Sequence, residues 1–140
     1  MIILDTNVLS ELMRRQPAPA VLRWLDLQPS QSVWITTITL FESRLGLALL
    51  PPGQRRESLA QAFDQLLAID LENRVLPFDA EAAAQAALLA ADRQRNGRPV
   101  DIRDTQIAGI AQARRATLAT RNLRHFEGLT VAVEIGRAHV

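Results

Sequence analysis

A short apolar run at the start of the chain, 2–4, ends abruptly at the acid Asp5. A run of this length that is rich in β-branched residues is typical of a strand buried on both faces of a sheet. The polar residues Thr6 and Asn7 follow, and a helical pattern opens at Val8. In an open α/β sheet, the carboxyl end of a central strand borders the ligand crevice. A carboxylate there is costly unless another group pairs with it, so Asp5 is the first candidate for a functional residue.

Strand and helix patterns alternate along the rest of the chain. Strands are predicted at 2–4, 33–36, 74–77, 117–120 and 131–133, and helices at 8–15, 20–27, 37–50, 54–69, 79–96 and 101–115. This order indicates the α/β class, with a parallel sheet of about four to five strands and helices on both faces. Thr37 or Thr39 is predicted to cap the third helix and Asp79 the fifth.

The 140 residues contain no internal repeat and no linker, so one domain is predicted over residues 1–135. The tail, 136–140, continues no pattern, and we interpret it as frayed or as a cloning remnant. The long helix over 54–69 has an apolar stripe that is predicted to point inward, formed by Leu59, Ala62, Phe63, Leu66 and Leu67.

Composition excludes several kinds of chemistry. With no cysteine, the chain has no disulfide, thiolate metal ligand or thiol nucleophile. All 16 cationic residues are arginine, so a Walker A lysine and a Schiff-base lysine are excluded, whereas the arginine fork suits phosphate. No apolar run approaches the roughly 20 residues of a membrane span, and the first strand lacks the basic start of a signal peptide. A soluble cytoplasmic protein is therefore expected.

Glu42 lies on an apolar stripe of its predicted helix, because Ile38, Leu45 and Leu49 fall at helical spacing around it. An acid near a helix start is also favoured by the helix dipole and could simply face water. The apolar neighbours favour an inward position, and Glu42 is therefore the second candidate for a site residue.

Asp104 is the third acid of interest, since it shares a helix face with Ile107 and Ala108. A purely structural interpretation is at least as good here. Asp101 would be the N-cap of this helix and Asp104 would complete a pair resembling a capping box. We assign Asp101 mainly to capping.

Thr120, Arg121 and Asn122 follow residues 117–119 of a predicted strand, at another strand end, although they could form a plain polar turn. Strand ends and helix starts meet at one edge of a parallel sheet, so these residues are expected to join the three acids there. Two carboxylates about 4 Å apart repel by roughly 4 kcal/mol at an effective dielectric near 20. A cluster of oxygen ligands therefore points to Mg²⁺, or Mn²⁺, acting on a phosphate substrate.

The ordered motifs resemble those of a known family. They are Ile2-Ile3-Leu4-Asp5-Thr6-Asn7-Val8-Leu9-Ser10-Glu11, Thr39-Leu40-Phe41-Glu42, Ile102-Arg103-Asp104-Thr105-Gln106-Ile107-Ala108 and Leu118-Ala119-Thr120-Arg121-Asn122-Leu123-Arg124-His125-Phe126. Together they resemble PIN domains, and in particular VapC toxins of bacterial type II toxin–antitoxin modules, in the FitB-like branch. The resemblance covers the chain to about Ile135.

The resemblance implies a PIN-like three-layer sandwich and a metal-dependent ribonuclease. It implies that Asp5 and Asp104 bind magnesium, that Glu42 is the third catalytic acid, and that Thr6 and Asn7 bind water or phosphate. Hydrolysis would leave a 3′-hydroxyl and a 5′-phosphate. It also implies a homodimer and a cognate VapB-like antitoxin that masks the site. We expect the helix over 54–69 to help form the antitoxin groove.

One departure from the family pattern concerns the fourth acid of many relatives. The corresponding stretch here carries Asn122 and His125 instead. Asn122 can position water but adds no charge, and His125 is equally compatible with a structural role. Arg121 and Arg124 could contact the RNA backbone or be solvated surface arginines.

Two other classes of protein share part of this pattern. A receiver domain or a dehalogenase-type phosphatase also places an aspartate after its first strand, but the first needs a lysine and the second an acid at the position of Asn7. A non-catalytic PIN-like module that only binds RNA or an antitoxin remains open, because the fourth acid is missing.

Overall fold

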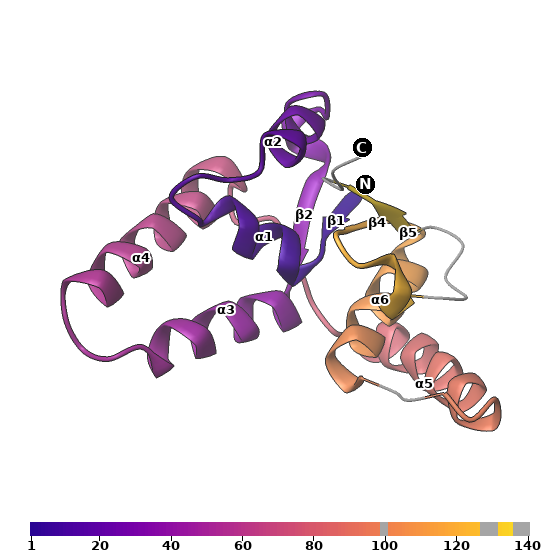
Figure 1. Cartoon of the computed structure of the whole chain (residues 1–140). Coiled ribbons are helices and arrows are strands. Elements are labelled where there is room, and N and C mark those ends of the chain that lie inside the picture. The colour runs from indigo at the N-terminus through magenta and orange to yellow at the C-terminus, as the bar shows by residue number, and fades with distance from the viewer. Residues whose placement is uncertain (99–100, 127–131, 136–140) are drawn as a thin grey trace.

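The protein is described here by a computed structural model, which covers residues 1–98, 101–126 and 132–135 (Figure 1). Five parallel strands form one sheet in the order β3-β2-β1-β4-β5. They are β1 (Ile2–Leu4), β2 (Val33–Thr36), β3 (Val75–Leu76), β4 (Thr117–Thr120) and β5 (Ala132–Glu134). The predicted α/β class and parallel sheet are confirmed.

Six α-helices connect these strands. They are α1 (Thr6–Leu12), α2 (Pro19–Asp26), α3 (Thr37–Leu49), α4 (Gln54–Gln65), α5 (Ala80–Arg95) and α6 (Ile102–Arg114). Three shorter turns are η1 (Ser30–Ser32), η2 (Leu66–Asp70) and η3 (Leu123–Phe126). In Figure 1, α5 and α6 lie on one side of the sheet, and α1, α3 and α4 lie on the other.

The two layers of helices follow from alternation within the central strand. Successive side chains of a strand point to opposite faces of the sheet. Ile3 belongs to a buried cluster with Ile107 and Ile110 of α6, whereas Leu4 belongs to a second cluster with Val8 of α1 and Phe63 of α4. The strand is buried on both faces, as its apolar run predicts, and the three-layer arrangement is confirmed.

Several predicted boundaries were wrong. The first helix starts at Thr6, because Asp5 itself is its N-cap. It ends at Leu12, before the predicted end at residue 15. Thr36, rather than Thr37 or Thr39, caps α3 through a hydrogen bond from the N–H of Thr39 to its hydroxyl at 3.1 Å. The predicted cap Asp79 is confirmed, since its carboxylate accepts from the N–H of residue 82 at 2.9 Å.

The helix predicted over 54–69 is also shorter than expected. The α-helix ends at Gln65 and a π-helical turn continues to Asp70. Phe63 points inward as predicted, but Ala62 is exposed. The last strand is described over 132–134, so it extends one residue beyond the predicted end at 133, and both position 131 and the predicted tail 136–140 lie outside the described residues. Within the described part of the chain, no helix has the length and apolar character of a membrane span.

Candidate active site

Asp5 joins the ends of two neighbouring strands. Its backbone N–H donates to the carbonyl of Ala119 on β4 at 2.9 Å. Its buried carboxylate accepts from the Thr6 N–H through Oδ1 and from the Thr120 hydroxyl through Oδ2, each at 2.8 Å. Because Asp5 is also the N-cap of α1, the strand end and the helix start together orient this carboxylate. Asp5 thus lies at the predicted edge of the sheet.

Glu42 reaches this edge from α3. Its Oε1 accepts a hydrogen bond from the Thr6 hydroxyl at 2.8 Å, and that hydroxyl lies 2.9 Å from the hydroxyl of Thr39. The apolar stripe that was expected to bury Glu42 does not extend along the helix, since Leu49 is 75% exposed. Glu42 is therefore positioned by its contact with Thr6 rather than by burial of a continuous apolar face of α3.

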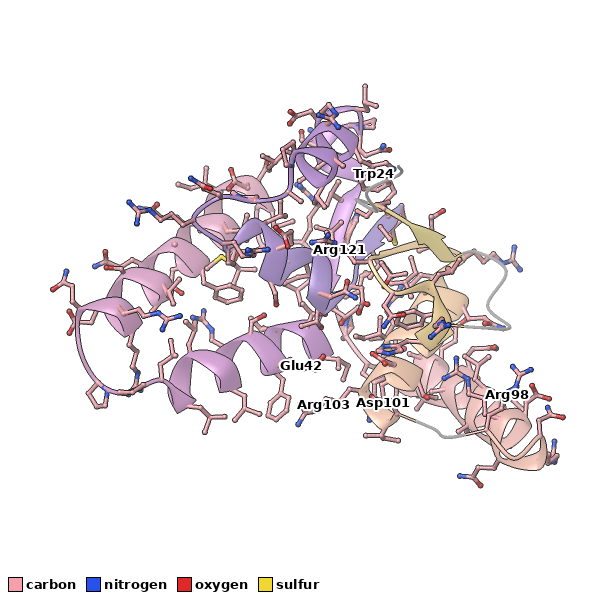
Figure 2. The ribbon with its side chains drawn as sticks, viewed as in Figure 1. Trp24, Glu42, Arg98, Asp101, Arg103 and Arg121 are labelled. Atoms are coloured by element: carbon pink, nitrogen blue, oxygen red, sulfur yellow. The ribbon has the colours of Figure 1, made fainter. Side chains whose placement is uncertain are left out.

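Asp104 lies in the first turn of α6. Asp101 is the N-cap of this helix, and its carboxylate accepts from the Asp104 N–H at 3.0 Å, which confirms the predicted cap. The carboxylate of Asp104 has a different partner, because its Oδ2 lies 3.0 Å from Nδ1 of His125. The backbone N–H of Asp104 thus takes part in capping α6, while its side chain contacts His125 of η3. In Figure 2, Glu42 extends from α3 toward the start of α6, where Asp101 is labelled.

Asp5 and Asp104 both have raised pKa values. Burial raises the pKa of Asp5, and the nearby charge of Glu42 raises it further. Burial also raises the pKa of Asp104 to about 6, with further increases from the charges of Asp101, Asp5 and Glu42. Carboxylates with raised pKa values are costly to ionise together, so the cluster favours a compensating cation.

The chemistry of these residues fits a hard divalent cation. Their ligand atoms are all carboxylate oxygens, as Mg²⁺ and Mn²⁺ prefer. Within 1–98, 101–126 and 132–135, no three acidic or histidine side chains already stand together as a metal-ligand group. Each carboxylate is instead bound to a protein donor, namely Thr120 for Asp5, Thr6 for Glu42 and His125 for Asp104.

Thr120 lies beside the acids, as its position at a strand end predicted. Its buried hydroxyl, which donates to Asp5, also lies 3.4 Å from Nδ2 of Asn7 and accepts from the Asn122 N–H at 3.0 Å. Asn122 Nδ2 lies 2.9 Å from Nε2 of His125. Asn7 and Asn122 therefore both lie next to the acids, as predicted. What the sequence did not predict is that one hydroxyl, that of Thr120, contacts Asp5, Asn7 and Asn122 together.

Arg121 is held by a buried acid, Glu11, that the sequence analysis did not select. The guanidinium of Arg121 forms an ion pair with the Glu11 carboxylate, and its backbone N–H donates to Asn7 Oδ1 at 3.1 Å. Glu11 also accepts from the N–H of Ala18 at 2.8 Å, and this bond, with those from Arg14, lowers the pKa of Glu11. An acid one helical turn after Asn7, among apolar residues, is the signal that could have found it.

A groove of about 800 Å³ opens beside the acids, between α1, α3 and α4. Thr6 and Glu42 form part of its wall, so it is continuous with the candidate site. Its apolar and basic lining comprises Leu9, Met13, Arg14, Arg15, Leu47, Leu50, Arg55, Leu59 and Phe63. The helix predicted to border a groove, α4, does so through Arg55, Leu59 and Phe63.

The chain resembles several known proteins along most of its length. It is 43% identical to plasmid stability protein StbB of Pseudomonas syringae pv. tomato, an alignment that covers 94% of this chain and 96% of that protein. It is 39% identical to VapC ribonuclease Y4jK of Sinorhizobium fredii over 91% of both chains. It is 38% identical to toxin FitB of Neisseria gonorrhoeae over 95% of this chain and 96% of FitB.

Solved structures agree with these relationships. The crystal structure of FitAcB from Neisseria gonorrhoeae contains a chain that superimposes with a TM-score of 0.87 at 37% identity, covering 97% of this chain and 98% of that one. A chain of FitAB bound to an IR36 DNA fragment gives a TM-score of 0.89 at 34% identity, covering 100% of this chain and 99% of that one. The profile of the PIN domain matches residues 2–129. With its parallel sheet, its acids at one sheet edge and these relatives, the chain belongs to the PIN domain family.

Proposed function

We propose that this protein is the ribonuclease toxin of a type II toxin–antitoxin module and hydrolyses RNA phosphodiester bonds with Mg²⁺, or Mn²⁺, as cofactor. The observation that carries the proposal is the convergence of Asp5, Glu42 and Asp104 at one sheet edge, where burial and neighbouring negative charge raise the pKa values of Asp5 and Asp104. The relative named VapC ribonuclease supports the reaction class. Action on cellular RNA places the protein in the cytoplasm.

Asp5 and Asp104 would hold the metal ion in this proposal. When bound, the ion supplies Lewis-acid polarisation of the scissile phosphate and a more acidic water. Glu42, oriented by the Thr6 hydroxyl, accepts the proton of the attacking water. Hydrolysis then leaves a 3′-hydroxyl and a 5′-phosphate.

The neighbouring polar residues orient the substrate in this proposal. Asn7 and Asn122 present amide groups beside the acids, and Thr6 lies between Glu42 and Asp5. Arg121 is positioned by its ion pair with the buried Glu11, and its side chain is 30% exposed, so in this proposal it contacts the RNA backbone.

The decisive experiment compares purified wild type with Asp5→Asn and Asp104→Asn on RNA in the presence of Mg²⁺. We expect each variant to lose at least about a hundredfold in cleavage rate, since a metal site contributes several kcal/mol to the transition state. Arg23→Gln, on the distant helix α2, is the matched control and keeps its activity. Retained cleavage in either aspartate variant would refute the assigned site. Mapping 5′-phosphate ends after brief induction then identifies the RNA target.

A non-catalytic PIN-like module is the second candidate, favoured by Asn122 in place of an acid. It predicts that Asp5→Asn leaves cellular toxicity unchanged and that Mn²⁺ does not bind. Calorimetric titration of the protein with Mn²⁺ separates the two proposals, because the enzyme requires binding that Asp5→Asn and Asp104→Asn weaken.

We also propose that a cognate VapB-like antitoxin occupies the groove between α1, α3 and α4, and that the toxin forms a homodimer. The similar structures of FitAB bound to DNA and of DNA-bound VapBC from Salmonella typhimurium, at 34% and 29% identity, support an antitoxin partner. Leu59, which is half-buried on α4, is the residue to test. Leu59→Asp is expected to weaken antitoxin binding with the fold retained, and unchanged affinity would exclude this role. Phe63 is unsuitable because it belongs to the core. Light scattering of the free toxin tests the homodimer.

A further inference from the structure

An arginine and a phenylalanine meet at the rim of the acid cluster. The guanidinium carbon of Arg103 lies 5.4 Å from the centroid of the Phe41 ring. Nη1 of Arg103 lies 3.5 Å from Oε2 of Glu42. Each member of the pair is next in sequence to an acid of the site, since Glu42 follows Phe41 on α3 and Asp104 follows Arg103 on α6. Figure 2 shows Arg103 beside Glu42.

The ring of Phe41 is unusually open for an aromatic side chain. It is 55% exposed, and Arg103 beside it is 44% exposed. An ion pair as long and exposed as that of Arg103 with Glu42 stabilises a fold little. Large aromatic rings are more often found in cores or at recognition surfaces than free in water. Stability of the fold therefore does not explain the pair.

A second arginine–phenylalanine pair in the same chain shows the structural alternative. Arg44 lies over the ring of Phe63 at 4.7 Å, but Phe63 is 1% exposed and forms part of the core. Arg44 also pairs closely with Asp64, at 2.7 Å, on α4. In that pair, the ring packs inside the protein and the cation has a strong partner on the protein. In the Phe41–Arg103 pair, neither condition holds.

An open ring beside a guanidinium has the chemistry that recognises a nucleotide. Any base can stack on an aromatic ring, and the arginine fork binds phosphate oxygens. A phosphate would be a better partner for Arg103 than a carboxylate oxygen at 3.5 Å. The position beside Glu42 places such a nucleotide next to the reacting phosphate of a bound RNA.

We propose that Phe41 and Arg103 form a nucleotide-binding subsite that holds the residue of a single-stranded RNA adjacent to the scissile phosphate. The base stacks on Phe41 and the phosphate of that nucleotide contacts Arg103. The proposal rests on the ribonuclease function proposed above. Phe41 does not line the groove assigned to the antitoxin, so the two surfaces can be tested separately.

The test measures binding of a short single-stranded RNA of random sequence, carrying one central 2-aminopurine, to the full chain in EDTA, where no cleavage occurs. We expect Phe41→Leu to weaken binding by roughly tenfold and to reduce the change in 2-aminopurine fluorescence on binding, because stacking is lost. Phe41→Trp should restore both signals, and Arg103→Gln should weaken binding. Arg44→Gln is the matched control, since Arg44 is 47% exposed and also lies over a phenylalanine.

The possible failures are distinguishable. If wild type neither binds nor, with Mg²⁺, cleaves RNA, the ribonuclease function itself fails. If wild type binds and cleaves RNA but Phe41→Leu and Arg103→Gln behave like Arg44→Gln, only the subsite is refuted. If Phe41→Leu instead changes the oligomeric state measured by light scattering, with RNA binding unaltered per folded protomer, the ring contacts protein and the subsite is also refuted. Mn²⁺ affinity unchanged by Phe41→Leu, together with weaker RNA binding, supports it.

Discussion

The helices on the two sides of the sheet pack in very different ways. On one side, α5 and α6 approach so closely that a Cβ on Gly109 would lie 2.6 Å from the carbonyl oxygen of Ala82 and 2.7 Å from the Cβ of Ala86. On the other side, Thr39 is the buried residue of α3, and a groove of about 800 Å³ separates this helix from α1 and α4. We call these the closed side and the open side.

The contrast indicates that the two sides of the sheet have different roles. The closed side fixes Asp104 relative to the sheet, because α6 is anchored by buried residues along its length. The open side leaves apolar and basic side chains uncovered, which is the surface expected for partners. The acids lie between the two sides, so one region supplies rigidity and the other supplies access. Three predictions test this difference.

The largest expected effect concerns the two phenylalanines of the open side. Phe63→Ala should lower the free energy of unfolding by about 3–5 kcal/mol, because the ring is buried where α4 anchors the open side to the sheet. Phe41→Ala should lower it by less than about 1 kcal/mol, since the ring is largely exposed. Urea denaturation measures both values. Similar losses would mean that the surface of α3 is part of the core.

The second prediction compares two helical glycines. Gly109→Ala should destabilise the protein by about 1–3 kcal/mol, because the new methyl group would meet backbone atoms of α5 that cannot move easily. Gly46→Ala should stabilise it by about 0.5–1 kcal/mol, since nothing lies within 4 Å and alanine favours a helix. Thermal unfolding of the two variants beside wild type gives the signs. Equal shifts would abolish the distinction between closed and open sides.

The smallest expected effect is electrostatic. The pKa of Asp104 is raised to about 6 in the folded protein, above its ordinary 3.8, so folding becomes less favourable as pH rises through this range. In EDTA at pH 7, Asp104→Asn should therefore be more stable than wild type by about 1–2 kcal/mol. The gap should close below about pH 3.8, where Asp104 is protonated in both states. Denaturation of both proteins at several pH values measures this difference in the free energy of unfolding.

The control for this electrostatic prediction is an acid of the open side. Asp64 is exposed and paired with Arg44, so Asp64→Asn should change stability by less than about 1 kcal/mol at any of these pH values. A loss of stability in Asp104→Asn at pH 7 would show that its contact with His125 outweighs the burial of charge.

Local sequence patterns predicted much of the fold. The strands at 2–4, 33–36 and 117–120 and the caps Asp79 and Asp101 agree with the structure, because short apolar runs and capping residues act within a few positions. Helix ends were less predictable. The π-helical turn after Gln65 depends on packing as well as on propensity, and no periodicity signals it.

Part of the site was also predicted, because the positions of residues at strand ends and helix starts can be recognised in the sequence. Asp5 and Asn122 follow strands and Asp104 starts a helix, so the topology of a parallel sheet brings them to one edge. Glu11 was not selected and the contacts of Thr120 were not predicted, because both depend on partners far along the chain. The hydroxyl of Thr120 reaches Asp5, and the carboxylate of Glu11 binds Arg121.

By itself, the sequence determined the class of fold, the order of strands and helices along the chain, and the acids that meet at the sheet edge. These depend on local periodicity and on the direction that strands and helices impose on their ends. Only the tertiary structure decided that Thr6 orients Glu42, that the surface of α3 stays open, and that Phe41 and Arg103 meet beside the site. Those contacts join residues more than thirty positions apart, and hydrogen bonds and packing between separate elements, rather than any local preference, create them.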